Sequence, residues 1–160
     1  MNLFYLDKDH DKNAEYHIDK HVAKMILETC EMICMCHLVD ETLGFTPRKL
    51  TPDEYRVVID YKKQFKILLP EQRRIPYIGR DSHLNHPSTI WIRSGMRNYE
   101  WAWCYASALE SERYYRNGTR EHKSFTLCKP LPLPNLPDVS TPFALAMKDF
   151  LKVHPPHCLG

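Results

Sequence analysis

The sequence predicts a mainly α-helical fold: a compact single-domain bundle of about four helices around a central N-terminal helix, with a long basic loop and a proline-rich strap. Two observations carry this prediction. An almost entirely apolar stretch of helical length spans residues 22–36, and a strong helix start follows at residues 51–54. No repeat or linker divides the 160 residues, so we expect one globular domain over residues 1–160.

Composition is that of an ordinary globular protein, with 43% hydrophobic and 26% charged residues. No apolar run approaches the roughly 20 residues that span a bilayer, so no membrane partner is expected. The N-terminus reaches Asp7 without a basic residue and does not resemble a signal peptide. These features predict a cytoplasmic location. The six cysteines contain no C-x-x-C pair, which favours reduced, buried thiols, and neither a metal nor a cofactor is expected.

Charge is unevenly distributed along the chain. Residues 1–47 hold four Lys/Arg against nine Asp/Glu, whereas residues 48–97 hold eleven against five. A basic middle third predicts a surface that meets an anion such as a phosphate. The alternative is a solvated face whose counter-charges lie on another segment.

Capping and breaking residues divide the chain into segments. The first helix is expected from Asp11 or Asn13 to about His37, and the second from Thr51-Pro52 to about Leu69. A long irregular connection then follows, and such connections are often functional. The remaining expected segments are a helix over residues 88–117 broken near Gly95 and stopped by Gly118, an extended strap over residues 128–138, and a last helix from Thr141-Pro142 to about Val153.

One narrow strip of the first helix is titratable. By the 3.6-residue repeat, five side chains fall within about 40° of a common line: His17, His21, Lys24, Glu28 and Glu31. Imidazoles suit acid–base work near neutral pH, and an ammonium group can hold a phosphate. The alternative is the wet edge of an amphipathic helix, with Lys24 and Glu28 as an ordinary i,i+4 pair. The two histidines also have zinc-ligand spacing, but no third ligand is evident.

Two further clusters carry polar residues. Residues 83–93 close the long connection and open a helix, where free backbone N–H groups can take an anion or serve only as a capped start. Arg116-Asn117, followed by four residues and His122, resembles the R-N-x4-H signature of the HEPN ribonucleases, which cut RNA without metal. The aromatic residues around Trp101 can stack nucleobases, although their helical spacing also fits a packed core.

These segments together resemble a family of small uncharacterised proteins of tailed bacteriophages. The likeness is carried by residues 1–7, the block Tyr16-His17-x-Asp19-Lys20-His21-Val22-x-Lys24-Met25-Ile26-Leu27-Glu28, residues 85–91, Asn98-Tyr99-x-Trp101, residues 116–122 and residues 141–147. The resemblance implies a viral origin and a location in the host cytoplasm. It implies no particular reaction.

We therefore predict that polar residues from three segments converge on one pocket. The expected catalytic residues are His17, His21, His86 and His122, and the expected substrate-binding residues are Lys20, Lys24, Glu28, Arg93, Asn98 and Arg116. The predicted function is acid–base chemistry on a nucleotide or nucleic acid. The alternatives are a non-catalytic phage protein that sequesters a host nucleotide signal or binds a host protein, and a HEPN-like ribonuclease. The oligomeric state is left open.

Overall fold

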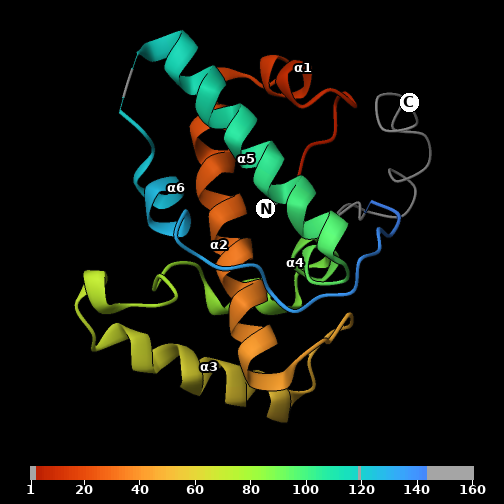
Figure 1. Ribbon diagram of the computed structural model, residues 1–160, viewed down its shortest axis with the longest axis vertical. Helices are drawn as coiled ribbons and strands as arrows, with labels where there is room; N and C mark the ends of the chain where they lie inside the picture. Colours follow the sequence, from red (N-terminus) through yellow and green to blue (C-terminus); the bar gives the residue numbers. More distant parts are fainter. Residues whose placement is uncertain (1–2, 119, 144–160) are drawn as a thin grey trace.

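The computed structural model describes residues 3–118 and 120–143, and in this part of the chain six α-helices and two 3₁₀ helices confirm the mainly α-helical fold (Figure 1). In chain order they are α1 (His10–Glu15), α2 (Asp19–Leu43), α3 (Pro52–Lys66), η1 (Pro70–Gln72), η2 (Asp81–Asn85), α4 (Pro87–Ile92), α5 (Met96–Asn117) and α6 (Lys123–Cys128). Over the same residues, no helix is long and apolar enough to cross a membrane.

Helix α2 lies at the centre of the bundle, as its apolar sequence predicts. Helix α5 crosses it, and α3, α4 and α6 also pack against it (Figure 1). Every residue from Met32 to Val39 is buried. The helix ends at Leu43 rather than near His37, because the chain first turns at Gly44, whose φ of 75° favours glycine.

The chain breaks between α1 and α2, so the prediction of one continuous helix is wrong here. Ile18 is extended, at φ −69° and ψ 153°. The carboxamide of Asn13 binds the N-terminal segment instead of solvent: it accepts from the Leu6 N–H at 2.7 Å and donates to the Phe4 carbonyl at 3.0 Å. The break turns His17 into the interior and off the exposed strip of α2.

Helix α3 begins as predicted, with a capping box. The Thr51 hydroxyl accepts from the Glu54 N–H at 3.3 Å, and the Glu54 carboxylate accepts from the Thr51 N–H at 2.9 Å. The helix ends at Lys66, short of the predicted end near Leu69. The Arg73 guanidinium donates hydrogen bonds to the free carbonyls of Lys66 and Leu68, at 3.2 and 3.0 Å.

Gly95 separates α4 from α5, and Gly118, at φ 60°, ends α5; both breaks are confirmed. A Cβ atom on Gly95 would lie 2.3 Å from the Val139 carbonyl oxygen, so only glycine lets the strap pass this close. The first N–H of α5, from Met96, donates to the Pro137 carbonyl at 2.8 Å. The proline-rich strap therefore supplies part of the N-terminal cap of α5.

The C-terminal part differs from expectation in one respect. The sequence does not predict α6, which occupies residues 123–128 directly before the strap. Residues 131–137 of the strap are free of helix and strand, as predicted, whereas Cys128 is the last residue of α6 and residues 129–130 form a turn. The predicted last helix lies outside the described residues from 144 onward, and residues 141–143 are not helical.

Cysteine side chains tie α6 to α2. Cys30, Cys34, Cys36 and Cys128 are buried, whereas Cys104 is exposed on α5. The sulfur atoms of Cys34 and Cys128 lie 3.6 Å apart. Burial raises the pKa of the Cys36 thiol to about 12, which makes it an inert apolar side chain at neutral pH.

Candidate functional site

The predicted catalytic His17 is buried with both ring nitrogens engaged. Its Nδ1 lies 2.7 Å from the Asn13 carbonyl oxygen, and its Nε2 lies 2.8 Å from the Tyr105 hydroxyl. Burial lowers the pKa of His17, so the ring is held neutral. These contacts favour a structural role for His17.

His21 and Lys20 lie on the first turn of α2. The His21 ring is half-buried and stacks on Phe4, with centroids 5.1 Å apart and planes inclined by 14°. Lys20 is exposed, and within the described ranges it makes no ion pair. Neither side chain lines the pocket described below.

His86 and His122 each begin a short helix. The Nδ1 atom of His86 accepts from the Ser88 N–H at 3.1 Å, and that of His122 accepts from the Ser124 N–H at 3.2 Å. Burial lowers the pKa of both histidines. A side chain that accepts from the second residue of a helix is acting as its N-cap, and this is where the structure places both.

Arg93 is buried among backbone carbonyls. Its three guanidinium nitrogens donate to Thr46 at 2.9 Å, Leu84 at 2.5 Å and Arg48 at 2.5 Å. Burial lowers its pKa to about 10, which leaves it charged at neutral pH. Its donors are committed to the fold, so this cation is not presented to a ligand.

Asn98 and Arg116 also hold segments together. The Asn98 carboxamide donates to the Trp91 carbonyl at 2.7 Å and exchanges hydrogen bonds with Thr141. The Arg116 guanidinium binds Glu112 at 2.7 Å, Asp19 at 2.8 Å and the Glu15 carbonyl at 3.0 Å. Arg116 thereby fastens the end of α5 to the junction of α1 and α2, with Gly118 and the end of α5 between it and His122.

The C-terminal part of the predicted titratable strip, from Lys24 to Glu31, lines a pocket. Lys24, Glu28 and Glu31 project from one face of α2 into a hollow of about 430 Å³, and Arg80 and His83 close it from the loop that follows α3. The Lys24 ammonium lies 3.9 Å from the Glu28 carboxylate and stays half-exposed. Of the predicted site residues, the structure brings Lys24 and Glu28 together here.

Glu31 and His83 form the closest titratable pair in this pocket. The His83 Nδ1 atom lies 3.2 Å from Glu31 Oε2, and both side chains are 14% exposed. The N–H direction is not aligned for a hydrogen bond, so Nδ1 is a buried polar atom without a bonded partner. Catalytic hydrogen bonds are often long or misaligned before substrate binds, so this geometry does not exclude the pair from a catalytic role.

Burial shifts the two groups in opposite directions. It raises the pKa of Glu31, with a further rise from the nearby Glu28, and lowers the pKa of His83, with further lowering from His86 and Arg80. Burial therefore moves the pKa of this carboxyl group and the pKa of this imidazole toward each other, which favours proton exchange between the two groups.

Two cations flank this pair from opposite walls. Lys24 stands on α2, and the exposed Arg80 stands on the loop. Over the described residues, no three His, Cys, Asp or Glu side chains are grouped so as to hold a metal ion. The hollow thus holds two cations, Lys24 and Arg80, and two carboxyl groups, Glu28 and Glu31, beside the His83 ring.

His83 and Arg80 were not among the predicted site residues, although His83 opens the polar cluster of residues 83–93. Both lie in the long basic connection, and the signal for that connection was its length. Their placement depends on Gly79, at φ 90°, where a Cβ atom would lie 2.9 Å from Met35 Cε and 3.2 Å from Glu31 Cβ. Glycine lets the loop lie directly on α2 here.

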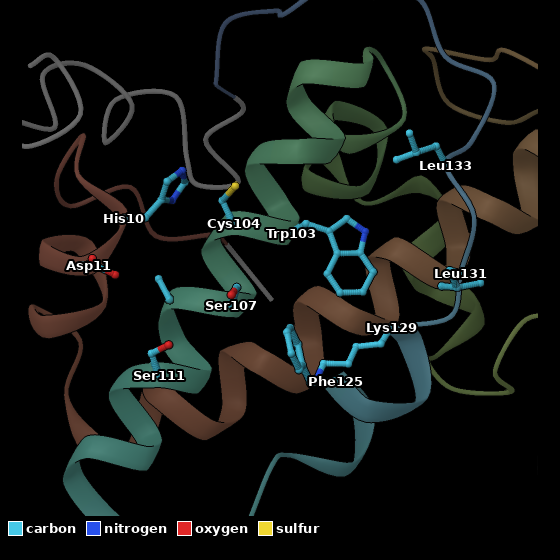
Figure 2. Close-up of a pocket in the computed structure, with 11 residues that line it drawn as sticks. His10, Asp11, Trp103, Cys104, Ser107, Ser111, Phe125, Lys129, Leu131 and Leu133 are labelled. Atoms are coloured by element: carbon cyan, nitrogen blue, oxygen red, sulfur yellow. The ribbon is translucent and has the colours of Figure 1, made fainter.

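A second hollow, an open groove of about 680 Å³, lies between α1, α5, α6 and the strap (Figure 2). Trp103, Phe125 and Leu133 are among its apolar lining, and serines of α5 lie along its floor (Figure 2). Its one lysine, Lys129, is bound to Glu121 at 2.5 Å. No titratable pair like Glu31 and His83 lies in this groove, so it is the weaker candidate for chemistry.

No protein-family model, curated protein or solved structure matches the chain. The case for function therefore stands on the geometry of the pocket between α2 and the loop.

Proposed function

We propose that the protein is an enzyme that performs acid–base chemistry on a phosphate-bearing substrate, a nucleotide or nucleic acid. The reaction takes place in the pocket between α2 and residues 77–85, which we call the His83 loop. The observation that carries the proposal is the 3.2 Å approach of His83 Nδ1 to Glu31 Oε2 in a hollow flanked by Lys24 and Arg80. Two titratable groups in contact, beside cations that can hold an anion, are the minimum for such a reaction.

Each side chain has a distinct part in the proposed reaction. Lys24 and Arg80 bind the phosphate and offset negative charge that develops on it. His83 is the general base: its Nε2, which no described residue bonds, takes the proton of the attacking water or hydroxyl as the new P–O bond forms. The bond from phosphorus to the leaving oxygen breaks, and that oxygen takes a proton from bulk water. Glu31 orients the ring through Nδ1–H and stabilises the imidazolium that forms, as the carboxylate does in a hydrolase triad.

A turnover assay tests the proposal. The purified protein is incubated with labelled single- and double-stranded DNA, RNA and a nucleotide mixture, with and without divalent metal, and products are identified by mass spectrometry. We expect Glu31→Gln and His83→Ala to lower the rate by about 10²–10⁴-fold. His10→Ala, which alters a half-buried histidine of the distant groove, is the matched control and keeps the native rate.

Other outcomes assign other functions. Retention of a phosphate-bearing ligand without turnover, lost in Lys24→Ala and Arg80→Ala, would identify a binder that sequesters its ligand. The bacteriophage resemblance makes a host nucleotide signal the ligand to test first. RNA cleavage that survives His83→Ala but is lost in His122→Ala would favour the HEPN-like alternative.

A further inference from the structure

A buried lysine holds the loop that carries His83. Lys62 lies on α3 and is 4% exposed. Its ammonium group donates to the Gly79 carbonyl at 2.7 Å and to Asp81 Oδ1 at 2.9 Å, and it lies 5.0 Å from the centre of the Tyr77 ring. All three contacts fall on one short segment, residues 77–81.

Such a lysine is unusual in a helix that packs on a core. Burying an ammonium group is costly unless its donors are paired, and lysine is almost never fully buried without a partner. Neither of its two hydrogen bonds is made to α2, the helix on which α3 packs; both go to residues 79–81. The buried lysine therefore holds residues 77–81 in position against α3, rather than linking α3 to α2.

The geometry links this anchor to the proposed site. Asp81 is the first residue of η2, and His83 lies in the same 3₁₀ helix. On the other side of the anchor, Gly79 is packed against Met35 and Glu31 of α2. Holding Gly79 and Asp81 thus fixes the start of η2, and with it the distance between the His83 ring and Glu31.

We infer that Lys62 is a positioning residue of the proposed active site, which acts on the reaction through the backbone of residues 79–83 and never touches the substrate. The inference rests on the proposed function for its catalytic meaning. Its physical core, the seating of His83 against Glu31, can be measured without any substrate.

The experiment compares Lys62→Met and Asp81→Ala with Lys63→Met, which removes a neighbouring lysine whose side chain is 66% exposed. Amide hydrogen exchange is recorded over residues 79–85, and the His83 ring is titrated by ¹⁵N NMR. We expect both anchor variants to speed exchange in this segment by at least about tenfold, because local opening becomes easier. The His83 pKa should rise toward its ordinary value as the ring gains water. Lys63→Met should change neither.

Two results would overturn the inference. One is unchanged exchange in both folded anchor variants. The other is a His83 pKa that rises in Lys62→Met but falls in Asp81→Ala, because charge removal alone would move it in those opposite directions. Asp81 is half-exposed, and Asp81→Ala leaves the Lys62 ammonium its hydrogen bond to the Gly79 carbonyl, so this variant decides the matter if Lys62→Met does not fold.

Activity separates the inference from the proposed function. With a substrate in hand, Lys62→Met should lower kcat and leave KM nearly unchanged, and Lys62→Arg should restore part of the rate. A native protein without turnover would remove the proposed function, while the exchange and titration results would still show whether Lys62 seats the loop.

Discussion

The Nε2 atom of His17 lies 2.8 Å from the hydroxyl oxygen of Tyr105, a residue 88 positions later in the chain. The Asn13 carbonyl can only accept, so His17 Nδ1 carries the proton and Nε2 accepts from the Tyr105 O–H. The neutral ring thus joins the junction of α1 and α2 to the middle of α5. His37 and Tyr99 repeat the arrangement at 2.7 Å.

Removal of the Tyr105 hydroxyl should destabilise the protein. Tyr105→Phe leaves a buried imidazole nitrogen without a partner, which we expect to lower the free energy of unfolding by about 1–3 kcal/mol. Urea unfolding at pH 7.5 measures the change. Tyr114→Phe, at a tyrosine that is 65% exposed, is the control. Equal stability of the two variants would contradict the role given to the His17–Tyr105 contact.

Arg93→Lys tests whether the buried guanidinium is structural. A lysine cannot reach three carbonyls at once, so at least one is left buried and unpaired, and we expect a loss of about 2–4 kcal/mol. Arg97→Lys, at an exposed arginine that pairs with Asp138 at 3.2 Å, should stay within about 0.5 kcal/mol of the native protein. Thermal or urea unfolding distinguishes the two. If Arg93→Lys left the free energy of unfolding unchanged, Arg93 would again be a candidate for anion binding.

Gly79→Ala and Gly44→Ala form a matched pair. Both glycines have positive φ, at 90° and 75°, so alanine is strained at each. Only at Gly79 would the new Cβ also press on Met35 and Glu31, whereas nothing lies within 4 Å of a Cβ at Gly44. We expect Gly44→Ala to cost about 1 kcal/mol and Gly79→Ala more, with faster amide exchange confined to the His83 loop. Equal losses in the free energy of unfolding, with unchanged amide exchange, would argue against close packing of Gly79 on α2.

Stability should fall on acidification through the range in which histidines titrate. Burial is the main cause of a lowered pKa for six histidines: His10, His17, His37, His83, His86 and His122. The ordinary pKa of histidine, 6.5, applies to the unfolded chain. Below that pH the unfolded chain binds protons at these histidines more readily than the folded chain does. The folded state is therefore most favoured above pH 6.5 and loses stability as pH falls through the lowered values.

Urea unfolding at pH 7.5 and pH 5.5 measures this effect, and we expect a loss of about 2 kcal/mol or more. Glu31 acts in the opposite sense, because its raised pKa lets the folded state take up a proton first. Glu31→Gln should therefore steepen the fall by removing that offset. A free energy of unfolding that is flat or rises toward pH 5.5 would show that the histidines are not held neutral.

Local signals in the sequence account for the elements that were predicted correctly. The capping box at Thr51, the break at Gly95 and the stop at Gly118 depend on residues within a few positions of one another. The break at residues 16–18 depends instead on Asn13 binding the segment near Phe4. No periodicity within α1 and α2 contains that information, so a continuous helix was the natural and incorrect prediction.

The candidate site shows the same division. Lys24, Glu28 and Glu31 share a face because of helical geometry, which the sequence displays directly. His83 comes from the segment after α3, where Gly79 and Asp81 are hydrogen-bonded by Lys62 of α3, and no local pattern in the sequence displays that placement. The positively charged Arg93 was a reasonable anion-binding candidate from its sequence neighbours. Its three carbonyl partners, which come from segments up to 47 positions away, remove it from that role.

The central position of α2 also has a consequence for synthesis on the ribosome. Its apolar surface is covered in part by α5 and α6, and the Cys34–Cys128 contact spans 94 positions. At about 5–20 residues per second, the synthesis of α6 is completed about 4–17 s after that of α2. During that interval the apolar surface of α2 lacks the helices that bury it in the folded protein. The nascent chain is therefore most prone to aggregation, and most in need of a chaperone, before its second half is synthesised.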